Sequence, residues 1–265
     1  MGEGFEVDWG GEAWELRHAD GRIGLHRPSG GGLHLALAGL TATGRYEDRV
    51  FTAEALVGFE LVHGRLLATF EPKGWHGLIV RAAWGSCREG RGIDLEVQAS
   101  TTSVGQLKRV EILVESRPMG DVPSDRFLTL VSPRDRLAAG STYDGREPSA
   151  VLRRLNTLHV PEPGRSSPSP PSAAKWDAAE IGAQGGYLEV GHADDIARHL
   201  RESADEGRIR WSRYALFGHD LEKGVVLRAR LRGVHVAVQA LKDADETLTD
   251  EIERFLAEPL PLRTA

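Results

Sequence analysis

Residues 92–100, GIDLEVQAS, are the stretch that decides the expected fold. Apolar and polar side chains alternate strictly along it: Ile93, Leu95, Val97 and Ala99 against Asp94, Glu96, Gln98 and Ser100. Successive side chains on a β-strand point to opposite faces of the sheet, so this strand would have one apolar and one polar face. Such a strand is typical of an antiparallel sheet with a buried side and a solvated side.

The same alternation recurs on both sides of this stretch. It predicts strands at 4–9, 12–18, 22–27, 32–37, 55–62, 64–72, 76–84, 108–116, 127–132, 208–217 and 224–238. Turn-forming residues separate these segments, as in PKGW (72–75) and REGRG (88–92). Many short strands with turn signals between them indicate an antiparallel β-sandwich. We therefore expect a mainly β protein, with residues 1–265 forming a single antiparallel β-sandwich domain.

Two segments show apolar residues at helical spacing, and we expect both to form helices at the periphery of the sandwich. They are 192–207, with Ile196, Leu200 and Ala204, and 243–259, with Leu248, Ile252 and Phe255. A third segment, 160–174 (VPEPGRSSPSPPSAA), is too rich in proline and serine for the interior of a strand or helix. We expect a long surface loop there, and a linker between two domains is the alternative.

The composition narrows the classes of partner. The net charge is −6 and the isoelectric point is near 5.9, whereas nucleic-acid binders are usually basic, so nucleic acid is not an expected partner. Cys87 is the only cysteine, which excludes an internal disulfide and a cysteine-based zinc site. The sequence has no apolar run near the roughly 20 residues of a membrane helix and no signal-peptide core at its start. We expect a cytoplasmic protein without a membrane partner or cofactor, and its oligomeric state stays open.

The stretch 216–234, LFGHDLEKGVVLRARLRGV, is the main candidate for a site. It is expected to form a hairpin whose second strand places three arginines on one face: Arg228, Arg230 and Arg232. Residues on one face of a strand stand about 6.6–6.8 Å apart, which suits a row of cations along an anionic ligand. The alternative is an ordinary solvated or salt-bridged sheet surface. In the turn, His219 and Glu222 have the side chains needed for proton transfer, although polar residues are also the normal content of a turn.

Two further places carry candidate residues. In EPKGWHG (71–77), Trp75 and His76 lie at a turn between strands, where the tryptophan would stack on a sugar ring or fold over the edge of the core. On the predicted helix 192–207, three potential metal ligands fall on one face: His192, Asp195 and His199. Their spacing differs from the His-Glu-x-x-His pattern of zinc proteases, and an Asp195–His199 ion pair explains it without a metal. We therefore expect no metal.

The run EPKGWHGLIVRAAWGSCREGRGIDLEVQASTTS (71–103), within a long series of antiparallel strands from about residue 4 to 240, resembles the galactose mutarotase-like (aldose 1-epimerase-like) β-supersandwich superfamily. The resemblance implies a concave sheet that binds a carbohydrate. In members that are epimerases, it implies a histidine acid, a glutamate base and an arginine that holds the sugar. In this chain His219 and Glu222 would move protons, Arg228 and Arg230 would hold the ligand, and Trp75 with His76 would line the site.

The sequence thus predicts a carbohydrate-binding or carbohydrate-active protein, with epimerase-like chemistry as one form of that activity. Its ligand would be a carbohydrate or an anionic small molecule. The alternative, from another class, is a non-catalytic scaffold protein that presents its arginine face to an acidic partner.

Overall fold

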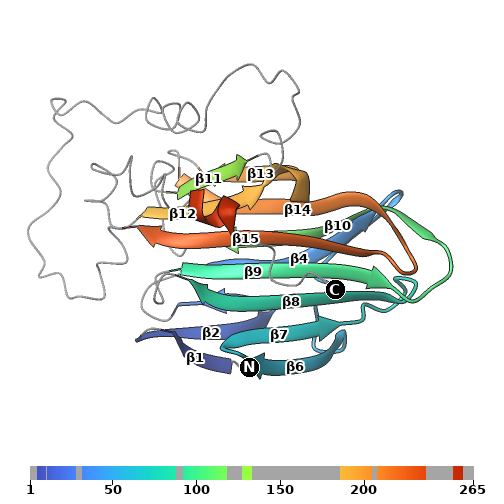
Figure 1. The fold of residues 1–265 in the computed structure, drawn as a ribbon, viewed down its shortest axis with the longest axis horizontal. Coiled ribbons are helices and arrows are strands. Elements are labelled where there is room, and N and C mark those ends of the chain that lie inside the picture. Colours follow the sequence, from blue (N-terminus) through green and yellow to red (C-terminus); the bar gives the residue numbers. More distant parts are fainter. Residues whose placement is uncertain are drawn as a thin grey trace, which may run out of the picture.

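The structure is a computed structural model that describes residues 5–9, 11–27, 32–87, 92–117, 127–132, 186–204, 208–236 and 253–258. Its strands form two sheets, which run along the long axis of the molecule (Figure 1). Sheet A has eight strands, in the order β1 (Phe5–Trp9), β2 (Glu12–Ala19), β3 (Arg22–His26), β4 (Leu33–Ala42), β10 (Gln106–Arg117), β14 (Arg208–Glu222) and β13 (Ile196–Ala204), with β5 (Arg45–Asp48) paired to β4. Sheet B has seven, in the order β11 (Phe127–Ser132), β12 (Gly186–His192), β15 (Val226–Val236), β9 (Gly92–Thr101), β8 (Leu78–Cys87), β7 (Arg65–Phe70) and β6 (Leu56–Val62).

The strand pairs are antiparallel, except that β11 pairs with β12 in parallel. The mainly antiparallel sandwich predicted from the alternation pattern is therefore confirmed. The opening stretch, β9, lies inside sheet B between β8 and β15. Its apolar face is fully buried, and its polar face forms part of the outer surface of the sheet.

The core fills the space between the two sheets, where the apolar faces of their strands meet. The largest buried side chains come from strands of both sheets and from the segments that connect strands: Trp14, Phe51, Phe70, Trp75, Trp84 and Tyr214. Two hydrogen bonds join polar groups across this space, where an unpaired buried donor would cost about 1–3 kcal/mol. The Trp84 indole N–H of sheet B donates to the Leu35 carbonyl of sheet A at 2.9 Å. The Tyr214 hydroxyl of sheet A donates to the Glu189 carboxylate of sheet B at 2.8 Å.

The predicted helix at 192–207 is wrong. The segment begins with the last residue of β12, continues through a 3-10 turn at Ala193–Asp195 and then forms the edge strand β13. β13 pairs along its length with β14, whose backbone would otherwise be left without partners on that side. An edge strand has one polar, solvated face and needs little apolar alternation, so its sequence pattern is weak. Leu200, which the helical pattern placed toward the core, is 48% exposed.

The predicted C-terminal helix is found at 253–257, and the rest of 243–259 lies outside the described residues. This short helix lies over β12 and β15 (Figure 1). Phe255 anchors it, because its side chain is fully buried against the His192 ring, with 5.0 Å between ring centroids. The Pro/Ser-rich segment 160–174 also lies outside the described residues.

The hairpin predicted at 208–238 is wrong in its pairing. Both strands exist, but β14 lies in sheet A, between β10 and β13, whereas β15 lies in sheet B, between β12 and β9. The chain therefore crosses from one sheet to the other at the turn after Glu222. Apolar residues on the inner faces of the two strands contribute to one core, so the strands face each other instead of sharing backbone hydrogen bonds.

Candidate functional site

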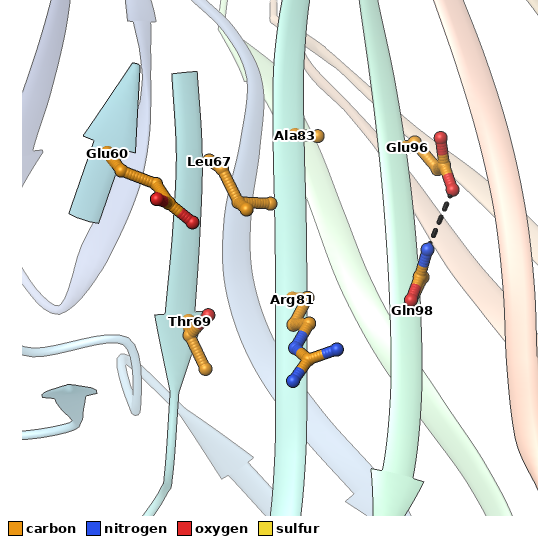
Figure 2. Close-up of a pocket in the computed structure, with 7 residues that line it drawn as sticks. All are labelled: Glu60, Leu67, Thr69, Arg81, Ala83, Glu96 and Gln98. Carbon is orange, nitrogen blue, oxygen red and sulfur yellow. Dashed lines mark hydrogen bonds between the residues drawn. The ribbon is translucent and has the colours of Figure 1, made fainter. Parts of the chain in front are cut away.

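A hollow of about 320 Å³ lies on the outer face of sheet B, over the strands β6 to β9. Seven residues line it: Glu60, Leu67, Thr69, Arg81, Ala83, Glu96 and Gln98 (Figure 2). Four strands that are consecutive in the sheet contribute these side chains, and all point to the side opposite the core. The rigid part of the sheet therefore positions the site.

Strand register explains why the surface is hollow at this place. Leu67, Ala83 and Glu96 lie in one row across β7, β8 and β9, and the middle residue is an alanine. The next row toward the β7 N-terminus has Gly85 at its centre, and the Arg65 side chain lies across it. The space over Gly85 is thus filled by Arg65, and the hollow lies over Ala83, whose short side chain is enclosed by longer side chains on the neighbouring strands.

Glu96 is the most buried polar group of the hollow, with 2% of its surface exposed. One carboxylate oxygen accepts a hydrogen bond from the Gln98 amide at 2.9 Å. The other oxygen is 3.5 Å from the Arg65 guanidinium, but it accepts no hydrogen bond within the described part of the chain. A buried carboxylate oxygen without a donor is unusual, because desolvation without a hydrogen bond is costly. This oxygen has almost no solvent-accessible surface, so a ligand hydroxyl would reach it only after a neighbouring side chain such as Arg65 moves.

The row beside Glu96 contains the free cations of this face. Thr69, Arg81, Gln98 and Arg228 lie side by side on β7, β8, β9 and β15. Arg81 is exposed and Arg228 is half-buried. Within the described residues neither guanidinium forms a hydrogen bond or ion pair. Neighbouring strands are about 4.8 Å apart, so the two arginine backbones flank Gln98 at a separation of roughly 10 Å.

Arg230 and Arg232, the next two arginines of β15, are held by the C-terminal helix and are each 3% exposed. Arg230 donates to the Phe255 carbonyl at 2.6 Å and to Glu258 at 3.2 Å. Arg232 binds both oxygens of Asp94, at 2.6 and 2.8 Å, and both oxygens of Glu258, at 3.1 and 2.7 Å. The predicted ligand-binding role therefore has an accessible side chain in Arg228, but not in Arg230.

The predicted catalytic residues, His219 and Glu222, lie at the crossing turn between the sheets and are both exposed. Glu222 is level with Gln106 of sheet A, and His219 is level with Val110. Neither residue lines the hollow. The predicted acid/base pair therefore lies apart from the hollow on sheet B, where Glu60, Glu96 and Arg81 meet.

Trp75 and His76, the predicted stacking residues, also lie outside the hollow. Trp75 is 1% exposed, its indole N–H donates to Glu47 at 2.7 Å, and the Arg45 guanidinium covers its ring at 4.0 Å. The indole therefore packs over the core edge and offers no open face to a sugar ring. His76 is exposed in a left-handed turn conformation with φ of 50°, and its carbonyl accepts a hydrogen bond from Thr101.

The three residues considered as metal ligands, His192, Asp195 and His199, do not share a helix face, because this segment forms the end of β12, a 3-10 turn and β13. His192 and Asp195 are buried, and His199 stacks on Tyr214 and bonds to the Ser212 hydroxyl at 2.9 Å. Among the described residues, no three histidine, cysteine, aspartate or glutamate side chains are grouped so that they could hold a metal ion.

A second polar cluster lies inside the sandwich. His34, His235 and Tyr187 meet with ring centroids 4.7 to 5.2 Å apart, beside Trp14. His34 is 3% exposed, and within the described residues neither of its ring nitrogens has a hydrogen-bond partner. Burial holds the pKa of His34 well below its usual value, with a smaller contribution from the neighbouring His235. Burial also lowers the pKa of His235 to about 3, so both rings are neutral at physiological pH.

Sequence reasoning did not single out Arg81, Glu96 or Gln98. The alternation pattern had already placed Glu96 and Gln98 on the polar face of residues 92–100, where they were interpreted as solvated surface. The missed signal was the small residue Ala83 on the neighbouring strand, because a small residue between longer side chains leaves a depression.

Comparison of the chain with models of known protein families and with curated proteins gave no match. No helix in the part of the chain that the structure describes is long and apolar enough to cross a bilayer.

Proposed function

We propose that this protein binds a carbohydrate in the hollow on the outer face of sheet B. The observation that carries the proposal is the convergence of Thr69, Arg81, Glu96 and Gln98 on one hollow. Its volume, about 320 Å³, falls at the small end of the range of roughly 300–1,000 Å³ for small-molecule sites. A lining rich in polar groups suits a small ligand with many hydroxyl groups.

The chemistry of the lining fits the hydroxyl groups of a sugar. The second oxygen of Glu96 can accept a hydrogen bond once a neighbouring side chain moves off it, Arg81 can donate several, and Gln98 and Thr69 can do both. Leu67 and Ala83 supply an apolar surface for the C–H face of the ring. None of the seven lining residues is aromatic, so binding would depend on hydrogen bonds and not on stacking.

The alternative, a scaffold that binds an acidic partner through its arginine face, has less support. Asp94 and Glu258 already pair with Arg230 and Arg232. Arg228 is the one of the three arginines on β15 without such a pair in the described part of the chain.

A thermal-shift screen against neutral and acidic monosaccharides tests the proposal. A sugar at about one hundred times its Kd should stabilise the protein by about 2.7 kcal/mol. The variant Ala83→Leu fills the hollow from its floor and should abolish the shift. The matched control is Ala13→Leu, at an exposed strand position of sheet A, which should leave the shift intact. Absence of a shift with every sugar, or a shift that survives Ala83→Leu, would overturn the proposal.

A further inference from the structure

The two free arginines of sheet B distinguish it from the outer face of sheet A. On sheet A, three arginines of different exposure are paired with carboxylates. Buried Arg22 bonds to Asp48 at 3.0 Å, half-buried Arg213 bonds to Glu115, and exposed Arg198 bonds to Glu111. The fold therefore provides acidic partners for these three arginines and leaves Arg81 and Arg228 of sheet B without them in the described part of the chain.

The charges around the hollow leave a small positive excess. Glu96 is shared with Arg65, and the residues under the C-terminal helix pair among themselves. The side chains left over in the described part of the chain are Arg81, Arg228 and Glu60. Two positive charges and one negative charge give this part of the surface a net charge of about +1 at neutral pH.

The positions of the cations indicate where a negative charge would lie on the ligand. Arg81 and Arg228 stand on either side of Gln98, at the end of the hollow away from Arg65. A guanidinium is planar and binds a carboxylate through two parallel hydrogen bonds. Glu96 lies one row further on, where it accepts hydrogen bonds and repels a second anionic group.

We propose that the ligand is an acidic sugar with one carboxylate, of the hexuronic acid class, whose carboxylate lies between Arg81 and Arg228 and whose hydroxyl groups bond to Glu96 and Gln98. The inference rests on the proposed function and narrows its substrate class. A single negative charge balances the excess of about +1, whereas a sugar phosphate would bring close to two negative charges at pH 7 and exceed it.

Isothermal titration calorimetry at pH 7 tests the inference with five probes: D-glucuronate, D-galacturonate, the matching neutral hexoses D-glucose and D-galactose, and glucose 6-phosphate. At least one uronate should bind at least about tenfold more tightly than its neutral hexose, a difference of about 1.4 kcal/mol. This preference should shrink as the salt concentration rises, because it comes from partly exposed charges. Arg228→Ala should remove most of the preference and leave the affinity for the neutral hexose within about twofold, because Arg228 does not line the hollow. Arg81→Ala should weaken the binding of both sugars, and that of the uronate more, because Arg81 lines the hollow.

Two further variants complete the experiment. Arg81→Lys keeps the charge but loses the planar fork, so it should retain only part of the preference. Arg17→Ala is the matched control, since Arg17 is an exposed strand arginine of sheet A, and it should change neither affinity.

Equal binding of uronates and neutral hexoses would overturn the acidic-sugar inference and leave the proposed function standing. So would a preference for glucose 6-phosphate over the uronates. Absence of binding by all five probes would overturn both.

Discussion

Arg232 should be a main stabilising residue of sheet B, while Arg228, four residues earlier on the same face of the same strand, should contribute almost nothing. Arg232 is buried and makes four hydrogen bonds, two to Asp94 and two to Glu258. The variants Arg232→Met and Arg228→Met remove the same guanidinium group from two positions whose environments differ. They therefore form a matched pair.

Removing one partner of a buried ion pair costs about 3–5 kcal/mol when the other charge stays buried. Here the cost is reduced because the Asp94 and Glu258 side chains are 17% and 34% exposed and regain hydration when Arg232 is lost. We expect Arg232→Met to lower the free energy of unfolding by about 2–3 kcal/mol. We expect Arg228→Met to change it by less than about 0.5 kcal/mol, as is usual for a surface substitution that breaks no contact.

Urea denaturation at pH 7 measures both variants, provided that the slope with denaturant is the same as in the parent protein. A double-mutant cycle with Asp94→Asn isolates the pair. Its coupling should be at least about 1 kcal/mol, because the two residues share two short hydrogen bonds. Equal effects of the two methionine variants, or a coupling near zero, would show that the contacts of Arg232 are not the source of its stability.

Three more predictions follow from the described structure. Burial lowers the pKa of His34 and His235 in the folded state, so these rings take up protons on unfolding at low pH. Their contribution to the free energy of unfolding is therefore complete above pH 6.5 and is lost as the pH falls toward about 3. For His235 alone, about 2 kcal/mol is lost by pH 5. Urea titrations at pH 8 and pH 5 measure this loss, and a pH dependence unchanged in His235→Phe would contradict it. Phe255→Ala should destabilise the protein by about 2–4 kcal/mol, since it removes a fully buried ring from between the helix and β15, and thermal unfolding in which Phe255→Leu is no milder would contradict that role. The double substitution His219→Ala with Glu222→Ala should leave the sugar affinity unchanged, because neither residue lines the hollow. A loss of affinity in calorimetry would indicate that the sugar binds at the turn after β14 instead.

Most strands could be predicted from the sequence, because alternation is a local property that each strand carries by itself. Residues 92–100 and 76–84 formed strands with the faces that their patterns indicated. The prediction of a helix at 192–207 was wrong because pairing with β14 makes this segment an edge strand. Such pairing through the backbone requires little of the strand's own side-chain pattern. The predicted pairing of the two strands at 208–238 was wrong for a related reason. The same alternation is found in two strands paired in one sheet and in two strands that face each other across a core.

The sequence by itself determined the class of fold and which side chains point outward from each strand. It placed Arg228, Arg230 and Arg232 together on one face of their strand, and Glu96 with Gln98 together on one face of theirs. These relations depend only on the two-residue period of a strand. The tertiary structure decided which of these side chains are available. It brought Asp94 and the helix at 253–257 over Arg230 and Arg232, and it left Arg81 and Arg228 free beside a hollow. Those contacts join residues up to 138 positions apart in the chain, and their strength depends on burial and register, which no local pattern encodes.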